Sequence, residues 1–357
     1  MTRSLLRPTA FVDSPFGHDG NVARLAGGMS WFAGIELISV EGHARTSIEL
    51  AAVEGIQDRF DDDMAAQWAA ITAPRAPLQL GERTIRLDQP QAMGIINATP
   101  DSFSDGGQFP DAASAGEAGA RMAADGAAIL DVGGESTRPG ARSIWEGDEI
   151  ERIVPVIRQL AAGGAAVSVD TRKADVMTPA VEAGARMIND VSALTYDDRS
   201  SEVAASLGVP VVLMHHKGAP EVMQDDPHYD DVLVEVYLWL EERIAAAVEA
   251  GISRQKILVD PGFGFGKNVA HNLELMNGLA LFHSLGCPLV AGASRKRTIG
   301  ALSNEAPADK RLGGSIAFAM KAVDQGAQIV RVHDVFETVQ ALKIWRGMRD
   351  QALTRRL

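Results

Sequence analysis

The chain has 357 residues, of which 46% are hydrophobic and 23% charged, as is typical of a globular protein with a sizeable core. Its net charge of -13 argues against general binding to nucleic acids or anionic membranes, although a local basic cluster could still hold an anionic substrate. A single cysteine, Cys287, argues against an intramolecular disulfide framework and suggests a reducing, cytoplasmic environment. We expect no secretory signal and no membrane span, because no sustained apolar stretch is long enough.

Residues 1–76 are predicted to form a separate α+β extension of unknown role. Trp31–Val40 is apolar and β-branched enough for a strand, and Ser47–Ala70 has helix-forming composition with an acidic break at Asp61–Asp63. The proline-containing stretch 73–77 reads as a linker. It is followed by a predicted hairpin around Gly81–Arg83, which could close the bottom of a second unit that spans residues 77–357.

From Ala92 onward, short apolar runs alternate with helical stretches. The apolar runs are 93–97, 127–132, 166–170, 186–189, 211–215, 257–260, 288–292 and 328–332. Helical stretches follow near 111–125, 146–162, 173–184, 198–207, 230–250, 270–285, 309–325 and 334–349. This repetition predicts an α/β fold of the TIM (β/α)8 barrel type. An open doubly wound sheet is the alternative, and the lack of a dinucleotide fingerprint disfavours it.

Polar residues lie at or near the end of each apolar run. The active site of such a barrel lies at the carboxyl ends of its strands. Helix capping could explain one polar tip, but a polar tip on every unit is hard to explain in that way, because a buried charge needs a partner. The tips are Asn97, Asp131, Asp170, Asn189, His215, Asp260, the run Ser294–Lys296, and Arg331 with His333.

The stretch Gly94–Gly107 combines a strand end with a polar loop. Asn97 lies at the tip of the strand, and Pro100 prevents the strand from continuing. Together with Asp101 and Asp105, Asn97 offers oxygen ligands of the kind that Mg²⁺ prefers. An ordinary βα turn in which one aspartate caps the next helix is the alternative.

Three later motifs have their own competing interpretations. Thr137 and Arg138 lie in a glycine-rich loop and could hold a phosphate or carboxylate oxygen, or the loop could be a solvated surface segment. The adjacent His215 and His216 suggest zinc, but neighbouring side chains point in different directions, which disfavours it. Residues 260–267 resemble a phosphate-binding loop but fail the Walker pattern at Pro261.

The stretch Gly94–Gly107 resembles the first signature of dihydropteroate synthases, enzymes that join a pterin diphosphate to 4-aminobenzoate. Ala98 stands where valine is usual. The resemblance continues through seven motifs over about residues 90–345, among them 131–140, 170–173, 188–191, 260–267, 292–297 and 331–334. It implies a Mg²⁺-dependent folate-pathway transferase, a target of sulfonamides, that forms a homodimer through late barrel helices.

The resemblance also implies roles for individual residues. The Mg²⁺ ligand would be Asn97. The catalytic residues would be Asn97, Asp101, Asp105, Arg138, Arg331 and His333. The two substrates would contact Thr137, Arg138, Asp170, Asn189, Met214, Asp260, Phe265, Lys296, Arg297, Arg331, Val332 and His333. Within that set, Met214 would form an apolar floor under the pterin, and Lys296 would hydrogen-bond the pterin carbonyl.

Besides Ala98, this sequence departs from the family pattern at three positions. His216 and Lys217 stand where the family often has methionine and arginine. Arg297 replaces a serine that holds the 4-aminobenzoate carboxylate in many members, so its side chain could contact that carboxylate or point to solvent. A pterin-binding methyltransferase barrel and a non-catalytic pterin- or phosphate-binding protein are the rival interpretations, and the residues for a diphosphate site argue against the first.

Overall fold

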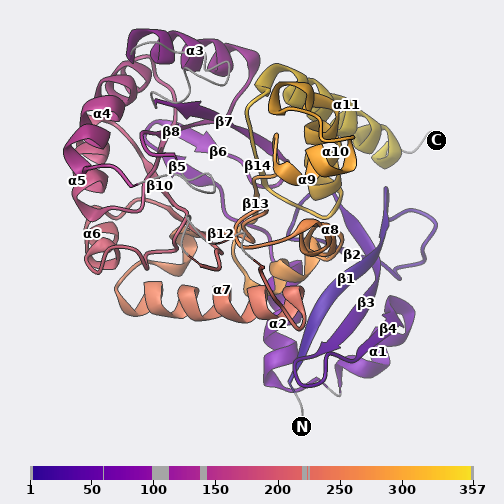
Figure 1. Cartoon of the computed structure of the whole chain (residues 1–357). Helices are drawn as coiled ribbons and strands as arrows, with labels where there is room; N and C mark the ends of the chain where they lie inside the picture. Colours follow the sequence, from indigo (N-terminus) through magenta and orange to yellow (C-terminus); the bar gives the residue numbers. More distant parts are fainter. Residues whose placement is uncertain are drawn as a thin grey trace.

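The computed structural model describes residues 3–58, 60–98, 112–136, 143–218, 223 and 226–354. In this part of the chain, eight parallel strands form one sheet that curls into a barrel (Figure 1). The strands are β7 (Gln91–Asn97), β8 (Ile129–Gly133), β9 (Val167–Asp170), β10 (Met187–Asp190), β11 (Val211–Met214), β12 (Ile257–Asp260), β13 (Val290–Ala291) and β14 (Ile329–Val332). β14 pairs with β7, and a parallel bridge between Val259 and Leu289 joins the two ends of the sheet. The predicted TIM barrel is confirmed.

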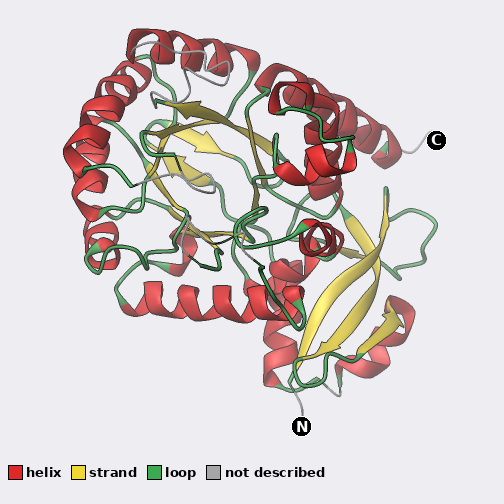
Figure 2. Cartoon of the chain, in the orientation of Figure 1, coloured by secondary structure: helices red, strands yellow, loops and turns green. Residues whose placement is uncertain are grey.

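Helices cover the outside of the barrel and connect successive strands (Figure 2). They are α3 (Ala112–Asp125), α4 (Glu146–Ala162), α5 (Ala174–Ala183), α6 (Ser200–Leu207), α7 (Val232–Glu249), α8 (Val269–Asn277), α9 (Arg297–Leu302), α10 (Leu312–Asp324) and α11 (Val335–Leu353). Their inward faces follow helical spacing. In α4, for example, Ile153, Val156, Ile157 and Leu160 recur every three or four residues, and all are buried.

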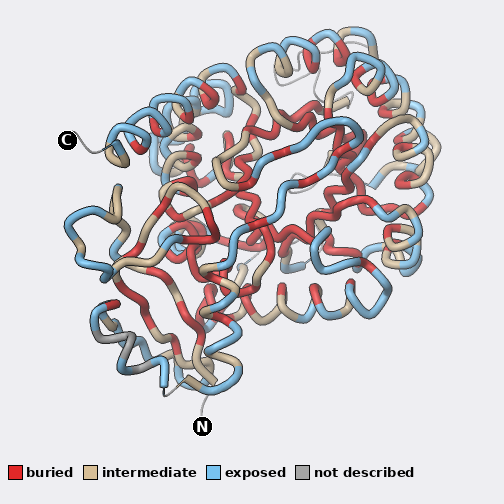
Figure 3. The backbone as a smooth tube through the Cα atoms, turned by 180° about the vertical axis from the view of Figure 1, so that it is seen from behind, coloured by how far each residue is buried: buried red, intermediate tan, exposed pale blue. Residues whose placement is uncertain are grey.

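The apolar core has an outer and an inner layer. The outer layer lies between the strands and the helices. The inner layer fills the barrel at the amino-terminal end of the strands, with Met93, Met187 and Leu258 among its members. The hairpin of β5 (Leu78–Leu80) and β6 (Arg83–Ile85) adds apolar side chains to this inner layer. Figure 3 shows the chain from behind, with buried segments in the interior and exposed segments on the surrounding helices and on loops that cross the front of the view.

The N-terminal residues form a small antiparallel sheet beside the barrel (Figure 1). Its strands are β1 (Ser4–Val12), β2 (Ala23–Arg24), β3 (Trp31–Ser39) and β4 (Arg45–Glu49), followed by α1 (Leu50–Gln57) and α2 (Asp62–Thr72). Leu5 and Ile38 of this sheet belong to the outer core of the barrel. Arg75 donates a hydrogen bond to the carbonyl of His283 at 2.9 Å. The sheet is therefore packed onto the barrel by apolar and polar contacts.

Two predicted helices differ from the structure. The first three residues of the helix expected from Ser47 fall in β4, because β4 pairs with β3. The Asp61 side chain caps the separate helix α2 by accepting from Met64 N–H. The helix expected over 270–285 ends at Asn277 and is followed by η3 (Leu279–Leu285), a 3-10 helix. Gly278 lies at this break, where a Cβ atom would come within 2.4 Å of Leu233.

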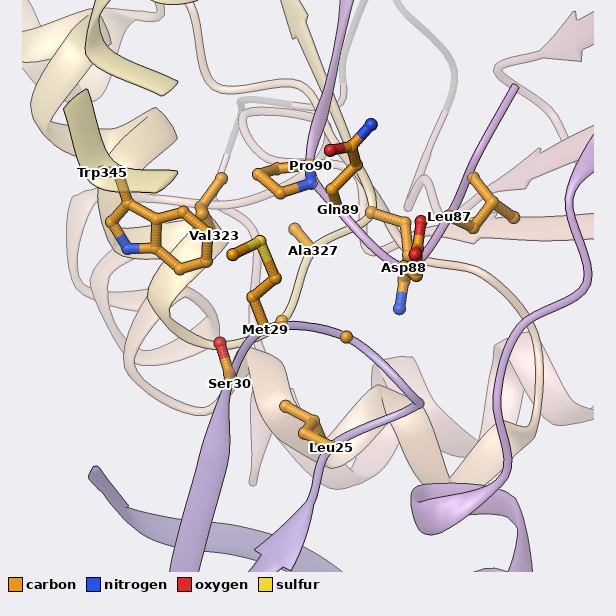
Figure 4. A pocket seen from close by; sticks show the side chains of 13 residues that line it. Leu25, Met29, Ser30, Leu87, Asp88, Gln89, Pro90, Val323, Ala327 and Trp345 are labelled. Carbon is orange, nitrogen blue, oxygen red and sulfur yellow. The ribbon is translucent and has the colours of Figure 1, made fainter. Parts of the chain in front are cut away.

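A pocket lies where the N-terminal sheet meets the amino-terminal end of the barrel (Figure 4). Met29 from the sheet side, Pro90 before β7, Ala327 before β14 and Trp345 of α11 line it. It therefore opens at the end of the barrel opposite the carboxyl ends of the strands. In the described part of the chain, no helix combines the length and the apolar character needed to cross a membrane.

Candidate active site

Polar side chains converge at the carboxyl ends of the barrel strands. Because the strands are parallel, these ends meet at one mouth of the barrel. Asn97, Asp170 and Asp260 are the last residues of β7, β9 and β12, and Asn189 lies one residue before the end of β10. The expected tip residues are therefore brought together at one end of the fold.

Arg331 of β14 is the centre of a buried network. Its Nε donates to Asp131 Oδ2 at 2.6 Å, and its Nη2 donates to Asp170 Oδ2 at 2.6 Å. Asn189 Nδ2 donates to the same Asp131 oxygen at 2.9 Å. Four strands thus hold their side chains in one fixed arrangement, since each member is oriented by at least one other.

The same network leaves acceptor oxygens available. The Oδ1 atoms of Asp131 and Asp170 are buried and have no hydrogen-bond partner among the described residues. Burial raises the pKa of Asp170 to about 7; the nearby Asp131 carboxylate adds to this shift, and Arg331 opposes it. Desolvation lowers the pKa of Arg331, but attraction to Asp131 and Asp170 outweighs it and holds that pKa above its ordinary value. An unpaired buried acceptor favours a ligand that donates hydrogen bonds.

Asp260 and the glycine-rich loop after it form the opposite side of the site. Asp260 Oδ1 accepts from Gly262 N–H at 2.7 Å, and burial raises the pKa of Asp260 to about 6 against the opposing effects of that hydrogen bond and Lys296. A Cβ atom on Gly262 would lie 1.8 Å from the carbonyl oxygen of His215, and its φ is +69°. Only glycine fits at this position, so β11 and the loop can pack closely.

Lys267 holds this loop in place by hydrogen bonds to its backbone. Its Nζ donates to the carbonyl oxygens of Gly262 and Phe265, both at 3.0 Å, and lies 2.7 Å from His215 Nδ1. The lysine is fully buried, and its burial lowers its pKa well below the ordinary value. The loop therefore depends on internal hydrogen bonds and is not a phosphate-binding loop of the Walker type.

Basic groups line the remaining side of the mouth. Lys296 Nζ lies 4.0 Å from the centroid of the Phe265 ring, which places the cation against the loop. His333 Nδ1 lies 3.1 Å from Ser294 Oγ. Arg295 forms a bidentate ion pair with Asp334 and has a left-handed backbone at φ +56°. The strained turn at Arg295 thus fixes the adjacent Lys296 between β13 and α9.

Three other expected contacts have different environments. Met214 is the last residue of β11 and is buried, as is Val332 of β14. Arg297 begins α9, as predicted, but its side chain is exposed and makes no hydrogen bond or ion pair with the described residues. Its exposed side chain is compatible with both alternatives for Arg297, contact with the substrate carboxylate or a position in solvent.

Among the residues expected at the Mg²⁺ site, Asn97 is the one that the structure describes. It is the half-buried last residue of β7, at the mouth of the barrel, and its amide supplies the kind of oxygen that Mg²⁺ accepts. Asp101, Asp105, Thr137 and Arg138 lie outside the described residues. Within the described residues, no three His, Cys, Asp or Glu side chains group into a metal site. Asn97 suits a metal that takes most of its ligands from a bound diphosphate and water.

Two positions contribute more than the sequence suggested. Asp131 was expected at a strand tip without a role in binding, yet it orients both Arg331 and Asn189. Lys267 was considered only in the context of a phosphate loop. A charged residue inside a buried strand is the available signal for Asp131, because such a charge needs a partner.

The mouth as a whole can hold a planar, hydrogen-bonding ring beside an anion. β8, β9, β10 and β12 supply carboxylate and amide acceptors at this end of the barrel, and Lys296, Arg331 and His333 supply donors. Acceptors held by fixed strands favour recognition of a ring edge with several N–H groups, and guanidinium and imidazole donors favour an acidic leaving group.

Comparisons with known proteins agree with this chemistry. Residues 93–333 match the family described as "Pterin binding enzyme". The dihydropteroate synthase of Escherichia coli (strain K12) is 47% identical over 262 residues, which cover 73% of this chain and 92% of the relative. The structure of a Yersinia pestis dihydropteroate synthase with a sulfonamide drug complex has a TM-score of 0.74 and 46% identity, covering 77% of this chain and 99% of that one. That of Xanthomonas albilineans dihydropteroate synthase with 4-aminobenzoic acid has a TM-score of 0.73 and 47% identity, covering 78% and 100%. The chain therefore belongs to the dihydropteroate synthase family of pterin-binding enzymes.

Proposed function

We propose that this chain condenses 6-hydroxymethyl-7,8-dihydropterin diphosphate with 4-aminobenzoate, giving 7,8-dihydropteroate and diphosphate in folate biosynthesis. The observation that carries the proposal is the set of buried acceptors around Arg331, in which Asp170 Oδ1 is left without a partner among the described residues. The relatives described above are named for the same activity.

The pterin half of the substrate would bind between the two sides of the mouth. Its aminopyrimidinone edge carries N–H donors that suit Asp170 and Asp260, and Asn189 is held in place by Asp131. Lys296 would donate to the pterin carbonyl. Met214 would contact the ring face as an apolar floor, and Phe265 would flank it. Each charged hydrogen bond of this kind contributes about 1.5–3 kcal/mol.

The reaction exchanges one bond at the pterin methylene carbon. The carbon–oxygen bond to diphosphate breaks, and the electron pair leaves with the diphosphate. The amine nitrogen of 4-aminobenzoate then forms a bond to that carbon and loses one proton. The chain contributes mainly by positioning both substrates and by placing Arg331 and His333 where negative charge develops on the leaving group.

We propose that Mg²⁺ accompanies the diphosphate and that Asn97 provides a protein ligand. When bound, the metal would neutralise negative charge on the leaving group. Asn97→Ala should lower turnover and weaken the Mg²⁺ dependence while leaving pterin-ring binding largely intact, because the amide contacts the metal and not the ring. Titration of activity with Mg²⁺ measures this, and an unchanged Mg²⁺ requirement would reject the assignment.

The second substrate would lie nearer the surface, beside α9. Arg297 is exposed at the first residue of this helix, so it could reach the carboxylate of 4-aminobenzoate without breaking an existing contact. The Yersinia pestis relative was solved with a sulfonamide complex, and we expect sulfonamides to compete with 4-aminobenzoate here. Arg297→Ala would then raise the KM for 4-aminobenzoate and weaken sulfonamide inhibition together.

We also propose a cytoplasmic homodimer. The buried free thiol of Cys287 suits a reducing compartment. Large apolar side chains are exposed on the late helices, with Phe336, Ile344 and Met348 on α11 and Leu312 on α10. A second copy of the chain could cover them.

One assay tests the proposed function. Purified protein is mixed with the pterin diphosphate, 4-aminobenzoate or both, and diphosphate release and dihydropteroate formation are measured. The synthase is supported if diphosphate is released only when both substrates are present, and if the amount of diphosphate equals the amount of dihydropteroate formed. A pterin-binding methyltransferase or a non-catalytic binding protein would bind the pterin without this coupled release.

A further inference from the structure

We propose that Arg45, on the N-terminal sheet, is a positioning residue for the pterin side of the active site and acts through the start of α7. The proposal rests on the synthase function proposed above. Residues 4–49 precede the family match, which begins at residue 93. The proposed role therefore concerns a part of this chain that the family's motifs do not include.

Arg45 contacts the residue that caps α7. Its Nη2 donates to Asp231 Oδ2 at 2.6 Å, and the Asp231 side chain is only 5% exposed. The other oxygen of this carboxylate, Oδ1, accepts from Leu233 N–H and Val234 N–H at 3.0 and 3.1 Å. One carboxylate thus holds the first turn of the helix with one oxygen and the N-terminal sheet with the other.

The segment before α7 forms a direct hydrogen bond with the glycine-rich loop of the site. Tyr229, two residues before Asp231, is buried and donates from its hydroxyl to the carbonyl of Gly266 at 2.9 Å. Gly266 follows Phe265 in the loop that begins at Asp260. A Cβ atom on Gly266 would lie 2.2 Å from the carbonyl oxygen of Lys217, so this loop and the segment after β11 pack closely.

Arg45 also lies beside the helix that follows this loop. Its Nη2 is 3.5 Å from Glu274 Oε1 on α8, and its Nη1 is 3.6 Å from Glu36 Oε2 on β3. Arg7 Nη2 pairs with the same Glu36 oxygen at 2.9 Å, which fixes that carboxylate within the sheet. Arg45 therefore joins the start of α7 to the second turn of α8. These helices follow β11, which ends at Met214, and β12, which ends at Asp260.

A second arginine, Arg3, lies one residue before β1 and provides a matched comparison. Arg3 pairs with Asp63 at 3.1 Å and with Glu241 at 2.6 Å, and Glu241 lies in the middle of α7. Both arginines join the N-terminal extension to the same helix and have similar side-chain exposure, 33% for Arg3 and 31% for Arg45. Only Arg45 contacts the end of α7 that leads to Tyr229 and the loop.

The experiment compares Arg45→Met, Arg45→Lys, Arg3→Met and Asp231→Asn in the full-length chain. Steady-state kinetics gives kcat and the two KM values, and thermal unfolding reports stability. Arg45→Met should raise the KM for the pterin diphosphate about three- to tenfold, with little change in the KM for 4-aminobenzoate or in kcat, because coupling of this kind is modest. Arg45→Lys keeps the positive charge, so its KM for the pterin diphosphate should stay close to that of the intact chain. Arg3→Met should lower stability without changing the KM.

Asp231→Asn keeps a good helix cap but removes the charge that Arg45 contacts. It should raise the same KM, and the Arg45→Met/Asp231→Asn double variant should be no worse than either single variant, since both remove one interaction. Equal KM shifts in Arg3→Met and Arg45→Met, additive effects in the double variant, or no shift in either Arg45→Met or Asp231→Asn would overturn the proposal. An inactive wild-type chain would instead contradict the proposed synthase function.

Discussion

At the scale of single residues, Arg331 sets the charge of the site, because it is shared between two buried carboxylates. Asp131 and Asp170 each form an ion pair with one nitrogen of the guanidinium, at 2.6 Å. Asp260 adds a third carboxylate to the same mouth, and its pKa is raised to about 6 by burial. Burial therefore shifts the titration of Asp170 and Asp260 toward neutral pH.

This charge balance predicts a pH dependence for pterin binding. The pKa of Asp170 is about 7 in the folded chain against an ordinary value of 3.8, so between these values the folded state holds a proton that the unfolded chain has released. The stability contributed by Asp170 therefore falls as pH rises through that range. Pterin affinity should change in the opposite direction, because the ionised carboxylate is the better acceptor, and should rise up to about tenfold per pH unit below pH 7.

Calorimetry with a pterin that lacks the diphosphate measures this dependence without titration of the phosphate groups. Asp170→Asn keeps the shape of the side chain and cannot ionise, so it should bind weakly and with a flatter pH profile. An Asp170→Asn variant with the same steep profile as the intact chain would assign the titration to another group.

The sequence located most residues of the site but not their partners. Asn97, Asp170, Asn189, Asp260 and Arg331 each lie at or next to the end of a recognisable apolar run, so their common location follows from the parallel topology. The pairing of Arg331 with Asp131 joins residues 200 positions apart and depends on the closure of the barrel between β14 and β7. Spacing along one strand carries no information about such a contact.

At the scale of elements, the loop from Pro261 to Lys267 is held by one buried lysine. Lys267→Met should destabilise the chain by at least about 1–3 kcal/mol, because it leaves buried acceptors on Gly262 and Phe265 unpaired. The KM for the pterin diphosphate should rise as well, since the loop carries Phe265 and follows Asp260. Urea unfolding and steady-state kinetics measure the two effects.

Lys256→Met is a matched control for this prediction, since Lys256 also donates to a backbone carbonyl, that of Gly208, but is exposed. Lys256→Met should change neither the free energy of unfolding nor the KM for the pterin diphosphate much. Equal stability in the Lys267 and Lys256 variants would show that the loop does not depend on the buried amine.

Periodicity predicted the barrel elements well where one face of a helix is buried. α4 occupies 146–162 as predicted, because its apolar residues recur at helical spacing and an exposed face separates them. The stretch 47–57 was less predictable, since its composition suits a helix while pairing with β3 takes residues 45–49 into a strand. The end of α8 at Gly278 could not be predicted from periodicity either, because it reflects the close approach of Gly278 to Leu233 on α7.

At the scale of the whole molecule, the proposed homodimer predicts a specific effect on α11. Ile344 and Met348 are one turn apart and are 63% and 62% exposed. Ile344→Asp should convert the dimer to a monomer, because a charge would have to be buried in the apolar contact between copies. Sedimentation or light scattering measures the mass in solution. Val248→Asp, on the exposed face of α7, is the control and should leave the dimer intact; an Ile344→Asp dimer would place the interface elsewhere.

The N-terminal extension gives the last prediction, because it is packed onto a barrel that already contains the site residues. Deleting residues 1–76 uncovers the buried helix η3 and removes Leu5 and Ile38 from the outer core, and burial of each such side chain contributes about 1.5–3 kcal/mol. The truncated chain should therefore unfold at lower temperature and be less soluble. Its kcat should stay close to that of the full chain, while the KM for the pterin diphosphate should rise as in Arg45→Met. Thermal unfolding and the coupled assay measure these effects side by side. A well-folded truncation without any activity would show instead that the extension completes the active site.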